Sequence, residues 1–325
     1  MKPIALLGVV ATMGGLGAAA PAQAATCTMA EAGASFGSVS SFAVRPGGLV
    51  ALGNFTATCG TGLMLAVLST DTFKATLNSD NGFVLRNTAD STKTVSYVAS
   101  NGSGTTYTQG GLVINAVGLN LLTLLLGRKA TVPLTLTTLA ANVPSGTYRD
   151  TLRLTWVYNF CDAVGVLGGC IGTVFSGTET RTVPVELQVY NDCAITPGSI
   201  NFGSAALPIH FAEAVSQMSL ICTTGMTYTV GLGPGDNAAA GRRQMRIENT
   251  SSLLAYDIFF AGNTTPWGTA EGTRVMSSQA VSGPSAGMAD GTTAHVFPYR
   301  ARVYPDQTPP PAGAYKDKVI INVQF

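Results

Sequence analysis

The chain has few charged residues, few histidines and no long apolar run after its amino terminus, and each shortage excludes a class of function. Only 11% of its 325 residues are charged and the formal net charge is +1, so we expect no electrostatic attraction to nucleic acid or to an acidic membrane surface. The two histidines, His210 and His295, lie far apart and suit neither a metal site nor a catalytic constellation. The most apolar later segment, 111–126, contains Asn115 and Asn120 and is too short to span a bilayer.

The amino terminus has the order of a secretory signal peptide. Lys2 precedes an apolar stretch that reaches Leu16, and small residues follow up to Ala22-Gln23-Ala24. Cleavage after Ala24 is therefore expected, with 1–24 as the signal peptide. All six cysteines lie after this point, and an even count in an exported protein favours disulfides.

The mature chain repeats one order of landmarks. Each copy has a cysteine, a Phe-Gly-Ser segment, a second cysteine and a Gly-x-Tyr-x-Asp segment. Cys27 and Tyr148 are 121 residues apart, and Cys193 and Tyr315 are 122 apart. This repeat predicts the disulfides Cys27–Cys59, Cys193–Cys222 and Cys161–Cys170. A zinc site is the competing interpretation, but there is no Cys-x-x-Cys pair to support it.

Alternating apolar and polar residues predict strands over 131–137, 151–158, 182–189 and 318–325. Turn residues recur between them, and no amphipathic helix of three turns is evident. The sequence therefore predicts an all-β fold of two immunoglobulin-like β-sandwich domains in tandem. We expect the domains over 25–190 and 191–325, each with its own core.

The second copy ends early. In the first copy, one strand-like segment (151–158) is followed by another that carries Val183, Val185, Leu187 and Val189. In the second copy, the residues that match the earlier strand are Val319, Ile321, Val323 and Phe325, and no further strand follows. We expect an incomplete second sandwich that lacks its last strand, with these four residues at the edge that accepts a strand from another chain.

One segment of the second copy resembles a known family. It has Cys222-Thr223, then Gly233-x-Gly235, Arg243-x-Met245, Trp267-Gly268 and Gly313-x-Tyr315-x-Asp317 followed by alternating apolar residues. This order resembles the spore coat protein U domain, a family that includes subunits of archaic (Csu-type) chaperone–usher pili. The resemblance is close over 193–325 and looser over 27–190, where the Trp-Gly element is missing.

The resemblance implies assembly by donor-strand complementation and a set of partners. These are a periplasmic pilus chaperone, an outer-membrane usher and the next pilin subunit, which supplies the donor strand. Only Ala25 and Thr26 would precede Cys27 after cleavage, so the sequence predicts a subunit that accepts a strand but donates none. It therefore looks like a two-domain tip adhesin, exported through the periplasm to the pilus tip at the cell surface, with no enzymatic activity and no cofactor or metal.

Apolar residues in the first copy are candidates for contact with an abiotic or host surface. By the resemblance, such tip adhesins hold surfaces through hydrophobic loops, and exposed apolar patches mark interaction sites. The predicted adhesive residues are Val164, Val166 and Leu167 in the Cys161–Cys170 hairpin, Leu119, Leu121 and Leu122 in a leucine-rich run, and Leu49 and Val50 after a Pro-Gly-Gly turn. Buried strands also read as continuous apolar runs, so the leucine-rich run has a core interpretation as well.

Three other functions stay open on the sequence alone. A structural pilin or coat subunit of the same family would need a mature amino terminus upstream of Ala25. A secreted glycan-binding module is harder to exclude, because sandwich lectins bind through loops without sharp motifs. An enzyme on a β-sandwich scaffold would need a metal spacing or a catalytic histidine arrangement, and neither is evident.

Overall fold

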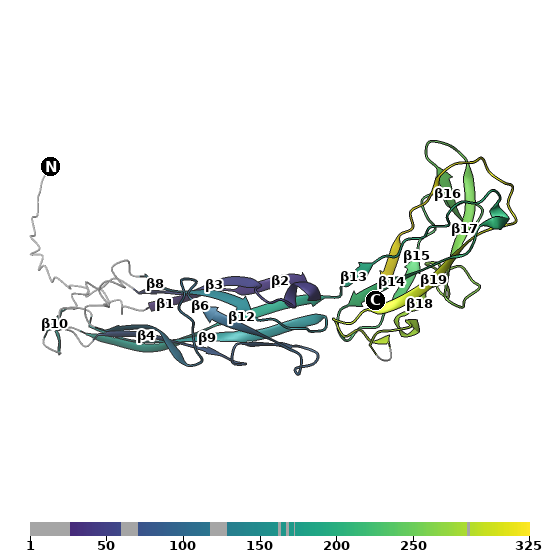
Figure 1. The fold of residues 1–325 in the computed structure, drawn as a ribbon. Coiled ribbons are helices and arrows are strands. Elements are labelled where there is room, and N and C mark those ends of the chain that lie inside the picture. Colours follow the sequence, from purple (N-terminus) through teal and green to yellow (C-terminus); the bar gives the residue numbers. More distant parts are fainter. Residues whose placement is uncertain are drawn as a thin grey trace, which may run out of the picture.

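The protein is an elongated molecule of two β-rich bodies joined end to end (Figure 1). The computed structural model describes residues 27–59, 71–117, 129–161, 164–166, 169–171, 173–284 and 287–325. Helix is confined to single turns in this part of the chain: α1 (Ser41–Val44), η1 (Pro208–His210) and η2 (Ser277–Gln279). No helix within the described ranges has the length and apolarity needed to cross a membrane.

The described residues contain twenty-one strands. The first body contains β1 (Cys27–Ala32), β2 (Ala34–Ser40), β3 (Val50–Cys59), β4 (Thr72–Ser79), β5 (Val84–Asn87), β6 (Thr94–Ser100), β7 (Gly111–Val117), β8 (Lys129–Thr138), β9 (Gly146–Cys161), β10 (Val164–Val166), β11 (Gly169–Ile171) and β12 (Val174–Tyr190). The second contains β13 (Cys193–Thr196), β14 (Ala214–Cys222), β15 (Thr229–Leu232), β16 (Arg243–Ile247), β17 (Leu253–Phe260), β18 (Val275–Met276), β19 (His295–Val303), β20 (Tyr315–Lys316) and β21 (Ile321–Gln324).

The first body is a complete sandwich. One face is formed by the antiparallel order β1-β3-β8-β6, and the other by β7-β4-β9-β12-β2, in which β2 and β12 run parallel. The short strand β5 pairs with both β6 and β9 and so joins the two faces. Buried side chains alternate with outward ones along these strands, as period two requires.

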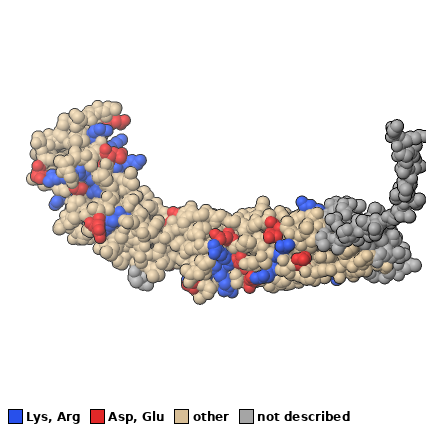
Figure 2. All heavy atoms as spheres, turned by 180° about the vertical axis from the view of Figure 1, so that it is seen from behind, with Lys and Arg blue, Asp and Glu red and all other residues tan. Residues whose placement is uncertain are grey.

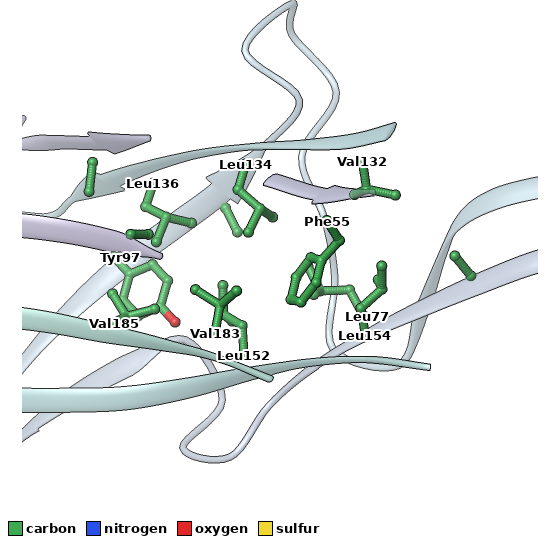
Figure 3. Close-up of a cluster of buried hydrophobic side chains, with 14 of the residues drawn as sticks. Phe55, Leu77, Tyr97, Val132, Leu134, Leu136, Leu152, Leu154, Val183 and Val185 are labelled. Atoms are coloured by element: carbon green, nitrogen blue, oxygen red, sulfur yellow. The ribbon is translucent and has the colours of Figure 1, made fainter. Parts of the chain in front are cut away.

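Side chains from both faces meet in one core. Phe55, Val132 and Leu134 project from one face toward Leu154 and Val183 on the other (Figure 3). All five are at most 1% exposed, so they contribute their full apolar area to folding. The strand β12 supplies Val183, Val185, Leu187 and Val189 to this core, which makes it part of the fold rather than an appendage.

The second body is built on the same plan with parts missing. One face has the order β13-β14-β19-β17-β16-β20, and the other is only β18-β15-β21. Strands β20 and β21 together correspond to β9. The pairing of β20 with β16 matches that of the start of β9 with β5. The pairing of β21 with β15 matches that of the rest of β9 with β4. Nothing among the described residues corresponds to β12, so the outer edge of β21 has no neighbouring strand.

These observations confirm the predicted fold class: two immunoglobulin-like sandwiches in tandem, with the second incomplete. The disulfides Cys27–Cys59 and Cys193–Cys222 are confirmed as well. Cys170 is also disulfide-bonded, but the side chain of its predicted partner, Cys161, lies outside what the structure describes.

Candidate functional site: an open groove and an apolar end

The second sandwich is hollowed along the edge of β21. A cavity of about 420 Å³ opens there between the two sheets. It is lined by Pro197, Gly198, Ser199, Ile200, Phe202, Met218, Leu232, Met245, Tyr256, Ile258, Tyr299, Tyr315, Lys316, Asp317, Val319 and Ile321. Its walls are the edge of β21 and the segment 197–202, which are the counterparts of β9 and β2. In the first sandwich β12 lies between those two strands, so the cavity has the place of one strand.

The four residues predicted at the acceptor edge do not share one environment. Val319 and Ile321 line the groove, and both are half-buried against the second core. Val323 packs against the same core but is not part of the groove wall. Phe325 is exposed. The strand itself is shorter than the predicted 318–325, because β15, its only partner among the described strands, has four residues.

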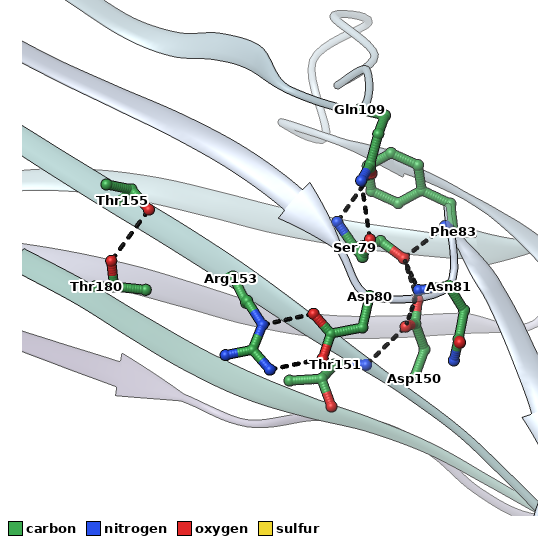
Figure 4. Close-up of polar contacts among 10 residues, drawn as sticks. All are labelled: Ser79, Asp80, Asn81, Phe83, Gln109, Asp150, Thr151, Arg153, Thr155 and Thr180. Carbon is green, nitrogen blue, oxygen red and sulfur yellow. Dashed lines mark hydrogen bonds and ion pairs between the residues drawn. The ribbon is translucent and has the colours of Figure 1, made fainter.

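A carboxylate marks the same position in both sandwiches. In the first, the Asp150 side chain is buried and accepts hydrogen bonds from Ser79 Oγ (2.6 Å) and the Asn81 amide (3.1 Å) (Figure 4). It accepts a third from Tyr97 Oη (2.6 Å). It thereby fixes the turn between β4 and β5. Val185 of β12 lies opposite Asp150 in the antiparallel pairing of β12 with β9.

In the second sandwich the equivalent carboxylate is Asp317. It accepts hydrogen bonds from Tyr256 Oη (2.8 Å), the Asp236 amide (3.0 Å) and Asn237 Nδ2 (3.3 Å). Burial and the Asp317 carboxylate raise the pKa of Tyr256 above its ordinary value, so this phenol stays a donor. Asp317 is only half-buried and lines the groove, since no strand covers it.

Arg274 fastens β21 to β15 on the outer face of the smaller sheet. Its guanidinium donates to Thr229 Oγ1 (2.7 Å) and the Thr229 carbonyl (3.1 Å) on β15. It also donates to Asn322 Oδ1 (2.8 Å) and the Asn322 carbonyl (3.1 Å) on β21. The groove wall is therefore held in place from one side while its other side is open.

At the opposite end of the molecule, several strands of the first sandwich end side by side. They are the strands that flank two of the predicted adhesive segments, the Cys161–Cys170 hairpin and the leucine-rich run. Register places the end of β3 beside the start of β8, the start of β4 beside the end of β7, and the end of β9 beside the start of β12. The hairpin β10–β11 lies at this end, far from the second sandwich (Figure 1). Val164 and Val166 belong to β10, although their side chains are not described, and Leu119, Leu121, Leu122 and Leu167 lie outside the described residues.

The leucine-rich run begins in a described strand. Leu112 and Val117 of β7 are exposed, while Ala116 is buried. Strand β7 is an edge strand that pairs only with β4 among the described strands. The first part of the leucine-rich run is therefore an edge strand with one exposed side, and not a fully buried strand.

Leu49 and Val50 lie away from these segments. Val50 begins β3 and is exposed, and Leu49 packs partly against the core. The nine steps of β3 from Val50 to Cys59 span ~30 Å at the usual rise of a strand. The structure therefore places this pair at the end of the first sandwich that faces the second, apart from the other candidates.

Sequence reasoning overlooked the segment 60–70, which connects β3 to β4. It contains Leu63, Met64, Leu65, Val67 and Leu68, and its flanking strands end where β7, β8, β9 and β12 also have ends. The signal was present as an apolar run between two strand-like segments. It carries no disulfide or turn motif, which is why the hairpin and the leucine run attracted attention instead.

Charge does not mark a site on the face shown in Figure 2. Lysine and arginine side chains lie among aspartates and glutamates on the first sandwich, and the second sandwich is similarly mixed. Exposed pairs such as Arg149–Glu186 and Arg153–Asp80 contribute to this mixture. No His, Cys, Asp and Glu cluster suited to a metal ion is found within the described ranges.

Two segments, 33–37 and 283–287, have the sequence Gly-x-Ser-x-Gly, the motif of a nucleophile elbow. The first places Ser35 inside β2, where its hydroxyl accepts from the Gly37 amide and donates to the Glu186 carbonyl. A nucleophile elbow needs a sharp strand-to-helix turn, and β2 continues past Ser35. The second, 283–287, contains residues outside the described ranges, and the next strand after it is β19.

Comparison with known families identifies the second half. Residues 179–322 match the family model described as the Spore Coat Protein U domain. This segment of the chain is therefore similar to a spore coat protein U domain. The match confirms the resemblance predicted from the Cys222, Arg243, Trp267 and Tyr315 landmarks.

Two solved structures of pilus proteins are similar to this chain, to different degrees. The chaperone–tip adhesion subunit pre-assembly complex CsuC–CsuE, from the archaic chaperone–usher Csu pili of Acinetobacter baumannii, contains a similar chain: identity is 20%, 92% of this chain and 100% of that chain are covered, and the TM-score is 0.56. The CupB6 tip adhesin from Pseudomonas aeruginosa is 10% identical over 91% of this chain and 93% of that chain, with a TM-score of 0.34. No curated protein matches. The similar chain of the CsuC–CsuE complex, with a TM-score of 0.56, therefore shares its overall fold with this protein.

Proposed function

We propose that this spore coat protein U protein is a non-enzymatic tip adhesin of an archaic chaperone–usher pilus. Its second domain, 191–325, accepts a donor strand, and its first domain, 25–190, attaches to surfaces through apolar loops. The partners are a periplasmic chaperone, an outer-membrane usher and the next pilin subunit, and the protein serves surface adhesion and biofilm formation. It is exported through the periplasm to the pilus tip.

The observation that carries this proposal is the groove. One sandwich has a strand, β12, between its β9 and β2, and the other has a cavity of about 420 Å³ in the same place. The side chains that β12 buries in the first sandwich are Val183, Val185, Leu187 and Val189. A donor strand with apolar residues at alternate positions would bury similar area in the groove, at ~1.5–3 kcal/mol for each side chain.

The apolar end supports the other half of the proposal. Two of the predicted adhesive segments and the overlooked segment 60–70 all connect strands that end together, far from the groove. An adhesin at the tip of a fibre needs its contact surface at the end opposite the attachment to the shaft. Leu49 and Val50 face the other way and form at most a separate contact.

A groove variant tests the proposal in the bacterium that makes the protein. Ile321→Asp puts a charge into the groove wall, so strand acceptance should fail and the variant should be missing from isolated pili. Gln324→Asp is the matched control, because Gln324 lies on the same strand but is exposed. Immunogold labelling of the first domain measures how many fibre ends carry the protein, and equal labelling for Ile321→Asp and the native chain would contradict the proposal.

A further inference from the structure

Strand β12 completes the first sandwich, but in the sequence it directly precedes the second sandwich. Strand β12 ends at Tyr190, shortly before Cys193, the first cysteine of the second copy. The family match begins at residue 179, inside β12, and ends at 322. The unit that the family model describes therefore includes a segment that fills the groove of the preceding sandwich. The chain has the form of two strand-linked subunits fused into one polypeptide.

The contact between the two sandwiches can therefore serve as a model for the contact between the second sandwich and a subunit that donates a strand to it. In each sandwich, a connecting segment follows the Phe-Gly-Ser residues. We call the end of the sandwich at which this segment lies the base. At the base of the first sandwich, Ser41 Oγ lies 2.7 Å from Thr223 Oγ1 of the second, and this contact is buried. Arg45 donates to the Gly291 carbonyl, and Asn142 Nδ2 donates to the Asp290 carbonyl at 2.7 Å.

The base of the second sandwich can be aligned to the first without a gap. Phe36 and Phe202 each lie nine residues after the first cysteine of their copy, and the glycines that follow them have φ values of 75° and 70°. Counting on, Ser41 corresponds to Leu207 and Ala43 to Ile209, and α1 corresponds to η1.

The exposure of these matched positions differs. Ser41 is 6% exposed because the second sandwich covers it, whereas Leu207 is 42% exposed and Ile209 is 66% exposed. Pro309 and Pro311 in the loop between β19 and β20 are exposed as well. The base of the second sandwich thus has an exposed apolar surface at the positions that, in the first sandwich, contact the second sandwich.

We infer that Leu207 and Ile209 form a docking surface for the next subunit of the fibre, a second spore coat protein U domain. That subunit would pack against them with loops equivalent to 223–225 and 289–291. Strand β12 runs antiparallel to β9 and leaves the first sandwich at its base, where the second sandwich begins. A donor strand with the direction of β12 would leave the groove of the second sandwich beside η1. The sandwich of the donating subunit would then lie against Leu207 and Ile209. The inference rests on the proposed function, because it needs a strand-donating neighbour.

Photo-crosslinking in the producing bacterium tests the contact. p-Benzoylphenylalanine is placed singly in the full chain at Val319 in the groove, at Ile209 on the base, or at Glu271. Glu271 is the control, an exposed residue after the end of β17 that is farther from the base. Pili are isolated after irradiation, and mass spectrometry identifies the crosslinked peptides.

We expect the Val319 and Ile209 probes to crosslink to the same polypeptide. The groove probe should reach its amino-terminal segment, and the base probe should reach the loop after its second cysteine or the loop before its counterpart of β19. In a second measurement, Leu207→Asp combined with Ile209→Asp should speed dissociation of that neighbour about tenfold and leave the groove crosslink intact.

The outcomes separate the two proposals. Groove crosslinks without base crosslinks to the same polypeptide, or an unchanged dissociation rate in the double variant, would overturn the docking surface and leave the proposed function standing. Absence of groove crosslinks to any spore coat protein U domain would overturn the proposed function and the docking surface with it.

Discussion

At the scale of single residues, the most consequential polar contact in the second sandwich is a buried ion pair. Arg243 and Asp257 have side chains that are each 5% exposed, and Nη1 of Arg243 lies 2.9 Å from Oδ1 of Asp257. Arg243 also donates to three backbone carbonyls, those of Gly233, Leu232 and Trp267. It therefore ties β16 and β17 to the loops beside the groove.

Removing the arginine should unfold the second sandwich far more easily. We expect Arg243→Met to cost about 3–5 kcal/mol of unfolding free energy, because the Asp257 carboxylate is left buried without its partner. The double variant Arg243→Met, Asp257→Leu should recover part of this loss. Urea unfolding followed by the fluorescence of Trp267, in a Trp156→Phe background, reports the second sandwich alone. Equal stability of Arg243→Met and the parent would contradict the role given to the pair.

We expect His295 to make the second sandwich less stable at acidic pH. The ring is buried, Nδ1 lies 2.8 Å from Tyr228 Oη, and burial lowers the pKa of His295, although the nearby Asp290 carboxylate acts in the opposite direction. The unfolded chain, with a histidine pKa of about 6.5, therefore takes up the proton first. Stability is complete above about pH 6.5 and falls as the pH drops toward the folded-state pKa, by at most ~1.4 kcal/mol per pH unit.

The measurement is the urea midpoint of the Trp267 transition at several pH values between 5 and 7.5. His295→Gln should flatten this pH dependence, whatever it does to the stability at pH 7.5. His210→Gln is the control, because His210 is exposed and its loss should leave the slope unchanged. A slope that survives in His295→Gln would assign the acid sensitivity to other groups.

At the scale of elements, the sequence predicted strands well where apolar alternation is imposed by a core on one side. The predicted segment 131–137 lies within β8, and 182–189 lies within the carboxyl-terminal half of β12, where both strands have buried residues at alternate positions. The repeat of cysteines and Gly-x-Tyr-x-Asp segments predicted both the disulfides and the missing strand, because equal spacing reflects equal topology.

Contacts between distant elements could not be predicted in the same way. Strand β9 is a single strand of 16 residues that serves both faces of the sandwich, and β2 runs parallel to β12. Nothing local in the sequence specifies either pairing. The same limit applies to Leu49 and Val50, whose distance from the other apolar segments follows from register and not from composition.

Among the described strands, β21 pairs with β15 alone, and Arg274 adds hydrogen bonds between the two. We expect Arg274→Ala to raise amide hydrogen exchange in β21 about tenfold or more, because several hydrogen bonds across β15 and β21 are lost. Arg246→Ala is the control: Arg246 is exposed on β16, in the other sheet. Exchange is read by mass spectrometry on peptides that cover 318–325, and an unchanged rate in Arg274→Ala would show that the β15 ladder alone holds the strand.

At the scale of the whole molecule, the two ends have different tasks in the proposed function. The groove and the surface of Leu207 and Ile209 lie in the second sandwich, toward the fibre. The strands that flank the apolar segments end at the far end of the first sandwich (Figure 1). A tandem of two sandwiches therefore separates the part that joins the fibre from the part that meets a surface, and each can be altered without the other.

Charges placed in the apolar segments should abolish attachment and leave assembly intact. We expect Leu121→Asp with Leu122→Asp, or Val166→Asp with Leu167→Asp, to reduce binding of piliated cells to polystyrene at least fivefold, because a charge disfavours dehydration of the contact. Ser96→Asp is the control, at an exposed position of β6 in the same domain. Val50→Asp shows whether the apolar pair at the other end contributes. Capture of specific glycans on an array that is unaffected by the two double variants, with polystyrene binding also unchanged, would instead favour a glycan-binding module.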